Sequence, residues 1–204
     1  GLFEKLLTEM PEPETGSPIV PKYWEDSATA TIGYGYGISI TPLQLCSTYA
    51  TLVNGGHLLK PTFLKKDKHD KFIKILNDKT SLKIKDLLRA VVLETKYTGP
   101  SVKAQGYEVG GKTGTTEIMT KKGYHKKANL SSFIGVFPIS EPKYIIYTMI
   151  REANGTKETQ FKTTGGWVAA PVVGRIIKRM INIIGIEPIK EKDFFIAKLN
   201  NNLN

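Results

Sequence analysis

The sequence predicts an α+β protein in which an antiparallel β-sheet is packed between helices. Three observations support this class: helical patterns come first in the chain, three strand-like segments follow one another, and a strongly amphipathic helix closes the pattern. Because a loop or a tight turn, rather than a helix, joins successive strands, they are expected to pair antiparallel.

Length and composition are those of an ordinary folded protein. Of the 204 residues 40% are hydrophobic and 24% charged, so the chain can bury a core without disulfides and is not disordered throughout. It carries 29 Lys and Arg against 19 Asp and Glu, a net charge of +10. Since the lysines are scattered along the chain, most of this charge is interpreted as solvated surface, and a basic nucleic-acid-binding module is kept as an alternative.

Cysteine content and hydropathy exclude several classes of protein. The single cysteine, Cys46, excludes an intrachain disulfide and a cysteine-based zinc site. No apolar stretch approaches the ~18 residues that a membrane span needs. The chain begins at Gly1 without an initiator methionine or a signal peptide, so it is interpreted as a piece of a longer protein.

The first third of the chain is expected to contain one clear helix. Residues 11–22 hold four prolines, which disfavours a helix there. In residues 31–40 glycines alternate with tyrosines, a pattern that lets another backbone approach closely. Thr41 then supplies an N-cap, with proline at the first helical position and glutamine three residues after the cap. This helix is expected to end at residues 54–56, Asn-Gly-Gly.

A hairpin, a second helix and the main sheet are expected next. Residues 58–64 and 71–76 would pair as short strands around a charged turn. Apolar residues recur on one face from about Ser81 to Thr95, which indicates a helix. The three strands of the main sheet are expected at residues 107–118, 130–139 and 143–152, the first two of them joined by a basic loop at 121–127.

The closing helix is expected at Trp167–Ile184, where an apolar face lies opposite a polar stripe. The stripe consists of Arg175, Lys178, Arg179 and Asn182. A helix that covers a sheet is the preferred interpretation of this pattern. Residues 188–204 show no clear pattern beyond Phe194-Phe195 and are interpreted as a tail.

The segment Gly110-Gly111-Lys112-Thr113-Gly114-Thr115-Thr116 carries the strongest chemical signal, and two incompatible hypotheses explain it. In the first, residues 106–113 are a P-loop, because they satisfy G-x-x-x-x-G-K-[ST] letter for letter. A P-loop needs a buried strand before it and a helix whose N-terminus faces the phosphates after it. Residues 97–105 do not form a buried strand pattern, and Gly114-Thr115-Thr116 is a poor helix start, so the context disfavours this nucleotide-binding hypothesis.

In the second hypothesis the segment is a substrate-binding strand. Lys112 is then a fixed cation on an extended backbone, and Thr113 and Thr115 offer hydroxyl donors to a carboxylate. Glycines, Gly114 among them, let a peptide lie alongside and pair with the main chain. Strand alternation puts Lys112 and Thr113 on opposite faces, so both can serve one ligand only if it lies along an open edge.

Around this segment the chain resembles the transpeptidase domain of class B penicillin-binding proteins, especially the cell-division type, whose motifs include K-T-G. The resemblance runs from near residue 1 to about Pro188, and its matching blocks are residues 31–45, 49–56, 112–115, 132–138 and 164–172. It implies a β-lactamase-like transpeptidase fold. Residues 1–187 would be the C-terminal part of that domain and residues 188–204 a tail.

The resemblance implies acyl transfer through a serine ester, with the serine in an S-x-x-K motif and a second motif, S-x-N, upstream of K-T-G. Ser140, with Lys143 three residues on, is the one serine here that fits S-x-x-K. It lies between two strand segments and after K-T-G, so it is interpreted as part of a hairpin turn. S-x-N is absent. The chain is therefore expected to lack the nucleophile and to be inactive alone.

Residue by residue, the resemblance assigns catalytic roles to Lys112 and Thr115. Lys112 would act electrostatically on the substrate carboxylate and on proton transfer, Thr113 and Thr115 would bind that carboxylate, and Gly114 would permit close approach. The backbone N–H of Thr115 would supply one oxyanion-hole donor. No cofactor and no metal are implied.

The partners that the resemblance implies are a peptidoglycan stem peptide ending in D-Ala–D-Ala, β-lactams, and proteins of the division or elongation machinery, with no nucleic acid. The domain would lie on the periplasmic side of the inner membrane, on an anchor outside this chain. The sequence leaves open whether the enzyme is of the septal or the elongation type, and whether it is a synthase or a penicillin-binding sensor.

The histidines and the basic loop are weaker candidates. His57, His69 and His125 are far apart and lack metal-ligand spacing, so each is interpreted as a surface residue. The basic loop at 121–127 is interpreted as solvated, although its cations could hold a phosphate.

Overall fold

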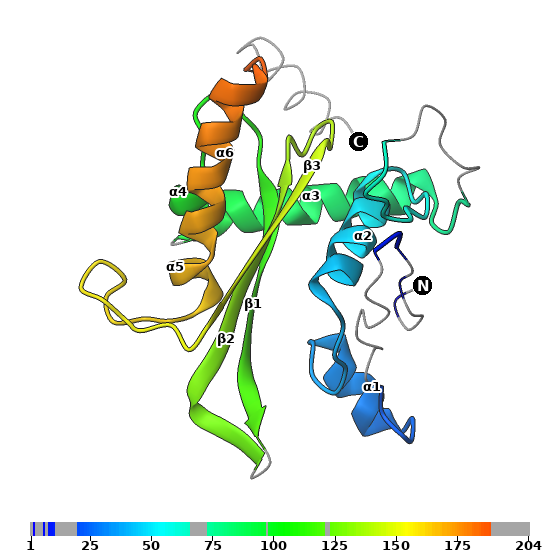
Figure 1. The fold of residues 1–204 in the computed structure, drawn as a ribbon, viewed down its shortest axis with the longest axis vertical. Coiled ribbons are helices and arrows are strands. Elements are labelled where there is room, and N and C mark those ends of the chain that lie inside the picture. The colour runs from blue at the N-terminus through cyan, green and yellow to red at the C-terminus, as the bar shows by residue number, and fades with distance from the viewer. Residues whose placement is uncertain are drawn as a thin grey trace. The chain divides into compact units, whose positions relative to one another are not determined.

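The structure, a computed structural model of the chain, describes residues 2, 6, 8–10, 20–65, 73–96, 98–120 and 123–188, the side chains of residues 99 and 119–128 excepted. The chain divides into two compact units, Gly1–Ile84 and Lys85–Asn204 (Figure 1). Among the described residues, no helix is both long and apolar enough to cross a bilayer.

The first unit holds α1 (Asp26–Gly33), α2 (Pro42–Val53) and the start of α3 (Asp78–Glu94). The predicted N-terminus of α2 is confirmed by a complete capping box. The Gln44 backbone N–H donates to Thr41 Oγ1 at 3.2 Å, and the Thr41 backbone N–H donates to Gln44 Oε1 at 3.0 Å. Helix α3 confirms the predicted second helix and begins three residues earlier than expected.

Residues 31–40 do not bear out the close backbone approach that the alternation of glycine and tyrosine indicated. Their first three residues end helix α1, which the sequence did not predict because it carries no apolar periodic face and buries no residue. Gly35 and Gly37 adopt positive φ angles of 98° and 83°, and a Cβ at Gly35 would meet nothing within 4 Å. Backbone conformation, rather than close approach of another strand, therefore accounts for these two glycines.

The predicted hairpin of residues 58–64 and 71–76 is reduced, over its described part, to a short antiparallel contact instead of two strands. An isolated antiparallel bridge joins His57 to Lys74, and the backbone N–H of Leu58 donates to the carbonyl of Ile73 at 2.8 Å. Pro61 interrupts the first segment because it has no N–H to offer to a ladder. Residues 66–72 lie outside the described part of the chain.

The second unit is built on an antiparallel sheet in the order β1-β2-β3, as predicted. Its strands are β1 (Gly110–Thr120), β2 (Gly123–Phe137) and β3 (Tyr144–Arg151). Strands β1 and β2 reach almost to the tip of their connection, so most of the expected basic loop belongs to β2. The hairpin connection between β2 and β3 is confirmed.

Helices complete this unit. They are the remainder of α3, α4 (Thr98–Val102), α5 (Gly165–Val168) and α6 (Ala170–Ile184). The predicted closing helix is thus two helices. The second has Pro171 in its first turn, where proline is favoured because the N–H that it lacks would have no partner within the helix.

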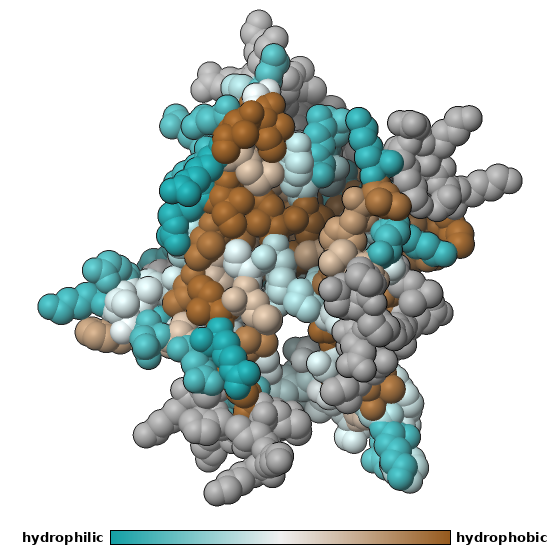
Figure 2. All heavy atoms as spheres, in the orientation of Figure 1, coloured by the Kyte–Doolittle hydropathy of each residue, from teal (hydrophilic) through white to brown (hydrophobic). Residues whose placement is uncertain are grey.

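The core of the second unit lies between the sheet and α6. Val173 and Ile177 of α6 and Phe133 and Phe137 of β2 are fully buried and belong to one hydrophobic cluster. Figure 2 shows hydrophobic side chains along the side of α6 turned toward the strands and hydrophilic ones along its other side, the amphipathic pattern that the sequence predicted. Burial of this face, at roughly 25 cal/mol per Å² of apolar surface, is the main force that holds the helix on the sheet.

Gly174 allows α6 to approach α4, and its substitution tests this packing. A Cβ at Gly174 would overlap the carbonyl oxygen of Ser101, so we expect Gly174→Ala to lower the free energy of unfolding by about 1–3 kcal/mol. A Cβ at Gly33 would meet nothing within 4 Å, so Gly33→Ala is the matched control and is expected to cost nothing. Urea unfolding followed by far-ultraviolet circular dichroism measures both. Equal stability of the two variants would contradict this packing.

Candidate functional site

The K-T-G segment lies in the first half of β1, at the edge of the sheet. Strand β1 pairs with β2 on one side, and no strand of the described residues pairs with its other side. Gly110–Thr113 are part of a strand that continues to Thr120, so no helix follows the motif. The P-loop hypothesis for residues 106–113 is therefore wrong, because its phosphate-binding loop and helix N-terminus are both missing.

Side chains of β1 alternate between the two faces of the sheet. Thr113 and Thr115 lie opposite Phe133 and Ser131 in the register with β2, and both of these partners are fully buried. The two threonines therefore share the face that α5 and α6 cover, whereas Lys112 projects from the other face, as the alternation predicted.

The amino group of Lys112 nevertheless lies beside the backbone of β1. Its side chain is exposed, and its Nζ donates a hydrogen bond to the backbone carbonyl of Thr113 at 2.9 Å. An ammonium group has three hydrogens, so two remain for an anion or for water. The Lys112 side chain thus folds back so that its amino group lies against strand β1 instead of extending into solvent.

The hydroxyl of Thr115 is oriented by helix α5. The backbone N–H of Gly165 donates to Thr115 Oγ1 at 3.1 Å, so the hydroxyl acts as an acceptor in this contact. A threonine hydroxyl has one hydrogen to donate besides its lone pairs, and no acceptor for it is found among the described residues. Because Thr115 is exposed, that hydrogen is available to a ligand.

Close packing of α5 against the strands requires glycine at position 165. A Cβ at Gly165 would overlap the carbonyl oxygen of Ser132 and lie 2.7 Å from that of Gly114. A Cβ at Gly114 would lie 2.6 Å from Ser132 Oγ. Gly165 is a residue of this site that the sequence motifs do not single out, although two successive glycines before an amphipathic helix are a signal of such packing.

The chain that leads into α5 is fixed to β2. Asn129 Nδ2 donates to Thr163 Oγ1 at 2.8 Å, and the buried Ser131 hydroxyl donates to the backbone carbonyl of Thr163. These bonds hold the start of α5, and hence the Gly165 N–H, in place over Thr115.

The other sequence candidates do not join this site. Ser140 lies exposed in the β2–β3 connection, and its carbonyl accepts from Lys85 Nζ at 3.3 Å. Lys143 pairs with Glu141 instead, at 3.6 Å between Nζ and Oε2. The hairpin-turn interpretation of Ser140 is therefore confirmed.

The histidines stay outside this site as far as they are described. His57 Nδ1 lies 3.3 Å from the carbonyl oxygen of Asn54, in the other unit of the chain. His69 and the side chain of His125 fall outside the described residues. Within the described part of the chain, no three His, Cys, Asp or Glu side chains are grouped to hold a metal ion.

Known proteins resemble this chain over most of its length. The family model described as "Penicillin binding protein transpeptidase domain" matches residues 3–178. The probable peptidoglycan D,D-transpeptidase FtsI of Caulobacter vibrioides is 30% identical over 197 residues, which are 92% of this chain and 33% of that protein. Stage V sporulation protein D of Bacillus subtilis is 34% identical over 176 residues, 80% of this chain and 26% of that protein. The chain thus spans about a third or less of these relatives.

Solved structures share the fold. The apo structure of the TP domain from Burkholderia pseudomallei penicillin-binding protein 3 superimposes with a TM-score of 0.70 at 27% identity, covering 82% of this chain and 49% of that one. This confirms the predicted α+β, transpeptidase-like fold.

The Thr115–Gly165 hydrogen bond can be tested by amide exchange. Thr115→Val removes the acceptor, so we expect the Gly165 amide hydrogen to exchange with solvent about fivefold faster, which corresponds to the roughly 1 kcal/mol net worth of such a bond. Two-dimensional NMR measures the exchange. Thr115→Ser should preserve protection, and Thr116→Val, which removes the neighbouring hydroxyl, should leave it unchanged. Unaltered exchange in Thr115→Val would refute the contact.

Proposed function

The chain belongs to the penicillin-binding protein transpeptidase domain family, and from this premise we propose that it supplies the substrate-carboxylate site of a peptidoglycan D,D-transpeptidase. Residues 1–187 would act as part of that domain, with residues 188–204 as a tail. The substrate is a stem peptide ending in D-Ala–D-Ala, and the cross-linking reaction proceeds by serine acyl transfer. The S-x-x-K serine and the S-x-N motif are contributed from outside these 204 residues.

One observation carries this proposal: at the open edge of β1, the Lys112 ammonium and the Thr115 hydroxyl each have hydrogens to donate. An extended peptide can pair its backbone with such an edge, in the manner of strand addition. Its terminal carboxylate then accepts charge-assisted hydrogen bonds, which are about twice as strong as neutral ones. Thr113 is the second hydroxyl assigned to that carboxylate.

Gly114 and the backbone of Thr115 serve the reacting carbonyl. Gly114 leaves the strand without a side chain where the substrate lies closest, and the Thr115 backbone N–H donates to the oxyanion that forms during attack. In the reaction the serine oxygen bonds to the carbonyl carbon of the penultimate D-Ala, and the terminal D-Ala leaves with a proton. An acceptor amine then bonds to that carbon, and the serine oxygen recovers a proton.

Lys112 acts on this sequence through its charge. It attracts the carboxylate of the incoming donor, and it favours the deprotonated form of a nearby nucleophile during proton transfer. We extend the same site to β-lactams, whose carboxylate occupies the place of the substrate's. Partners in the division or elongation machinery, and a position on the periplasmic side of the inner membrane, are part of the proposal.

The chain alone should not be acylated. We expect no covalent adduct when the purified 204-residue chain is incubated with a fluorescent penicillin and analysed after denaturation, because the nucleophile is not among its serines. A related full-length transpeptidase serves as the positive control. A labelled band that survives denaturation would show that one of these serines is the nucleophile, and Ser140, which fits S-x-x-K, would be the first candidate.

The role of Lys112 can be tested in a chimera. Residues 1–187 replace the corresponding segment of the Burkholderia pseudomallei transpeptidase domain, so that the partner half supplies the serine. We expect Lys112→Ala to slow penicillin acylation by about 100-fold or more, the loss typical of a deleted electrostatic stabiliser. Lys157→Ala, which removes an exposed lysine elsewhere, should acylate at the parent rate. Equal rates for the two variants would contradict the role of Lys112.

A further inference from the structure

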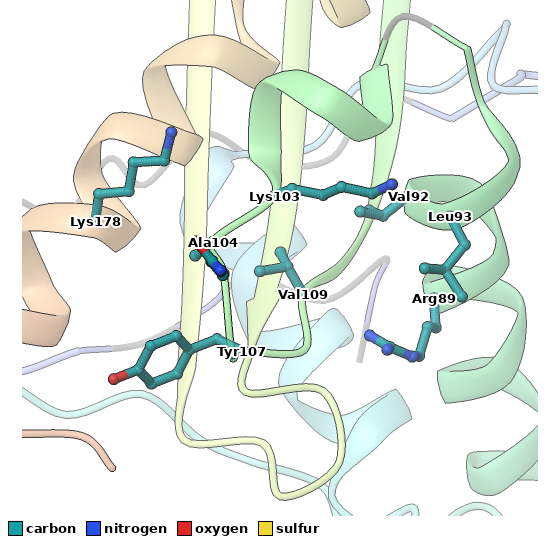
Figure 3. A pocket seen from close by; sticks show the side chains of 10 residues that line it. Arg89, Val92, Leu93, Lys103, Ala104, Tyr107, Val109 and Lys178 are labelled. Carbon is teal, nitrogen blue, oxygen red and sulfur yellow. The ribbon is translucent and has the colours of Figure 1, made fainter. Parts of the chain in front are cut away.

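A pocket of about 580 Å³ lies in the second unit, away from the K-T-G segment (Figure 3). It is lined by the end of α3, by the segment between α4 and β1, and by α6, and none of the four residues 112–115 takes part. Its volume is within the range of roughly 300–1,000 Å³ that is typical of ligand sites.

The floor of this pocket is apolar. Val92 and Val109 are each 2% exposed and Ala104 is 6% exposed, while Leu93 at the rim is 52% exposed. Val92, Val109 and Ala104 are therefore already closely packed, and the exposed Leu93 supplies apolar surface that a ligand can cover. An apolar group that covers it gains roughly 25 cal/mol for each Å² removed from water.

Three cationic side chains surround this floor, and two of them are uncompensated. Arg89 forms an ion pair with Glu108, with 2.6 Å between Nη2 and Oε1, and both side chains are largely buried. Lys103 and Lys178 are exposed and form no ion pair with any described residue. The pocket thus presents two free positive charges beside an apolar surface.

The two lysines are set apart. Lys178 belongs to α6, at one side of the pocket, and Lys103 extends on the other side toward Val92, with Ala104 and Val109 also at the pocket (Figure 3). A single phosphate or carboxylate contacts one such cation and leaves the floor uncovered. A ligand that uses the whole pocket carries two separated negative charges with an apolar group between them.

We propose that this pocket binds an acidic peptide segment of a partner protein, with an aliphatic or aromatic side chain on the floor and carboxylates at Lys103 and Lys178. A peptide supplies both features from neighbouring residues. A nucleic acid fits less well, because tracking its backbone takes a series of cations rather than two. This site is separate from the proposed carboxylate site on β1.

The proposal is tested with a capped hexapeptide, Glu-Asp-Leu-Phe-Glu-Asp, titrated into the ¹⁵N-labelled 204-residue chain. We expect saturable NMR shifts at residues 103–109. The double variant Lys103→Glu/Lys178→Glu should bind at least about tenfold more weakly, and Lys103→Arg/Lys178→Arg should bind within about threefold of the parent, since charge rather than shape is required.

Matched controls separate this site from general attraction between an acidic peptide and a basic chain. Lys60→Glu/Lys157→Glu makes the same change in net charge at exposed positions outside the pocket and should alter the affinity by less than about threefold. A peptide with Ser-Ser in place of Leu-Phe, and the rim variant Leu93→Ser, should each weaken binding. Circular dichroism checks the fold of each variant, and Lys103→Gln and Lys178→Gln replace the double reversal if it does not fold.

Three results would overturn the proposal. Equal loss of affinity in the pocket and control reversals would mean unspecific electrostatic binding, and full binding by the Ser-Ser peptide would exclude a role for the apolar floor. If a chain ending at Pro188 bound the hexapeptide at least about tenfold more tightly, residues 189–204, which include Glu191, Asp193 and Phe194-Phe195, would be the natural occupant instead of a partner. Penicillin acylation of the chimera does not depend on any of these outcomes.

Discussion

The hydrogen bond between the Gly165 backbone N–H and the Thr115 hydroxyl joins the closing helices to the strand that carries the motif. It forms only because α5 lies against β1 and β2 at a distance that excludes any side chain at position 165. The same bond determines which way the Thr115 hydroxyl can donate. The position of a short helix thus sets the chemistry of an exposed strand, and the burial of α6 on the sheet keeps that helix in place.

Structural features that depend on residues close together in the chain are predicted correctly from the sequence. The capping box joins Thr41 to Gln44, three residues later, and both of its hydrogen bonds are present. The alternation of Lys112 and Thr113 across the sheet followed from strand geometry alone. The match to the P-loop consensus is wrong because the consensus letters alone do not define a P-loop. Residues 110–120 form one strand with no helix after it, and this context decides the function of the segment.

Contacts between segments that are distant in the chain are not predicted by such local patterns. The short helix α1 buries no residue, so no periodic pattern marks it. The alternating glycines 35 and 37 suggest close approach in the sequence, whereas such approach occurs at Gly165 and Gly174, where carbonyl oxygens of distant segments leave no room for a Cβ. The proposed basic pocket is a further case, since Lys103 and Lys178 are 75 positions apart and only the packing of α4 and α6 brings them to one cavity.

An unpaired strand edge is also a hazard, because its free backbone groups can recruit any extended chain, including another copy of the same protein. Lys112 reduces this hazard because its amino group lies beside the backbone of β1. Two such edges that came together would bring like charges into a confined, poorly hydrated space, and the repulsion disfavours self-assembly through this edge. The positive charge of Lys112 that would bind an anionic ligand thereby also disfavours aggregation through this edge.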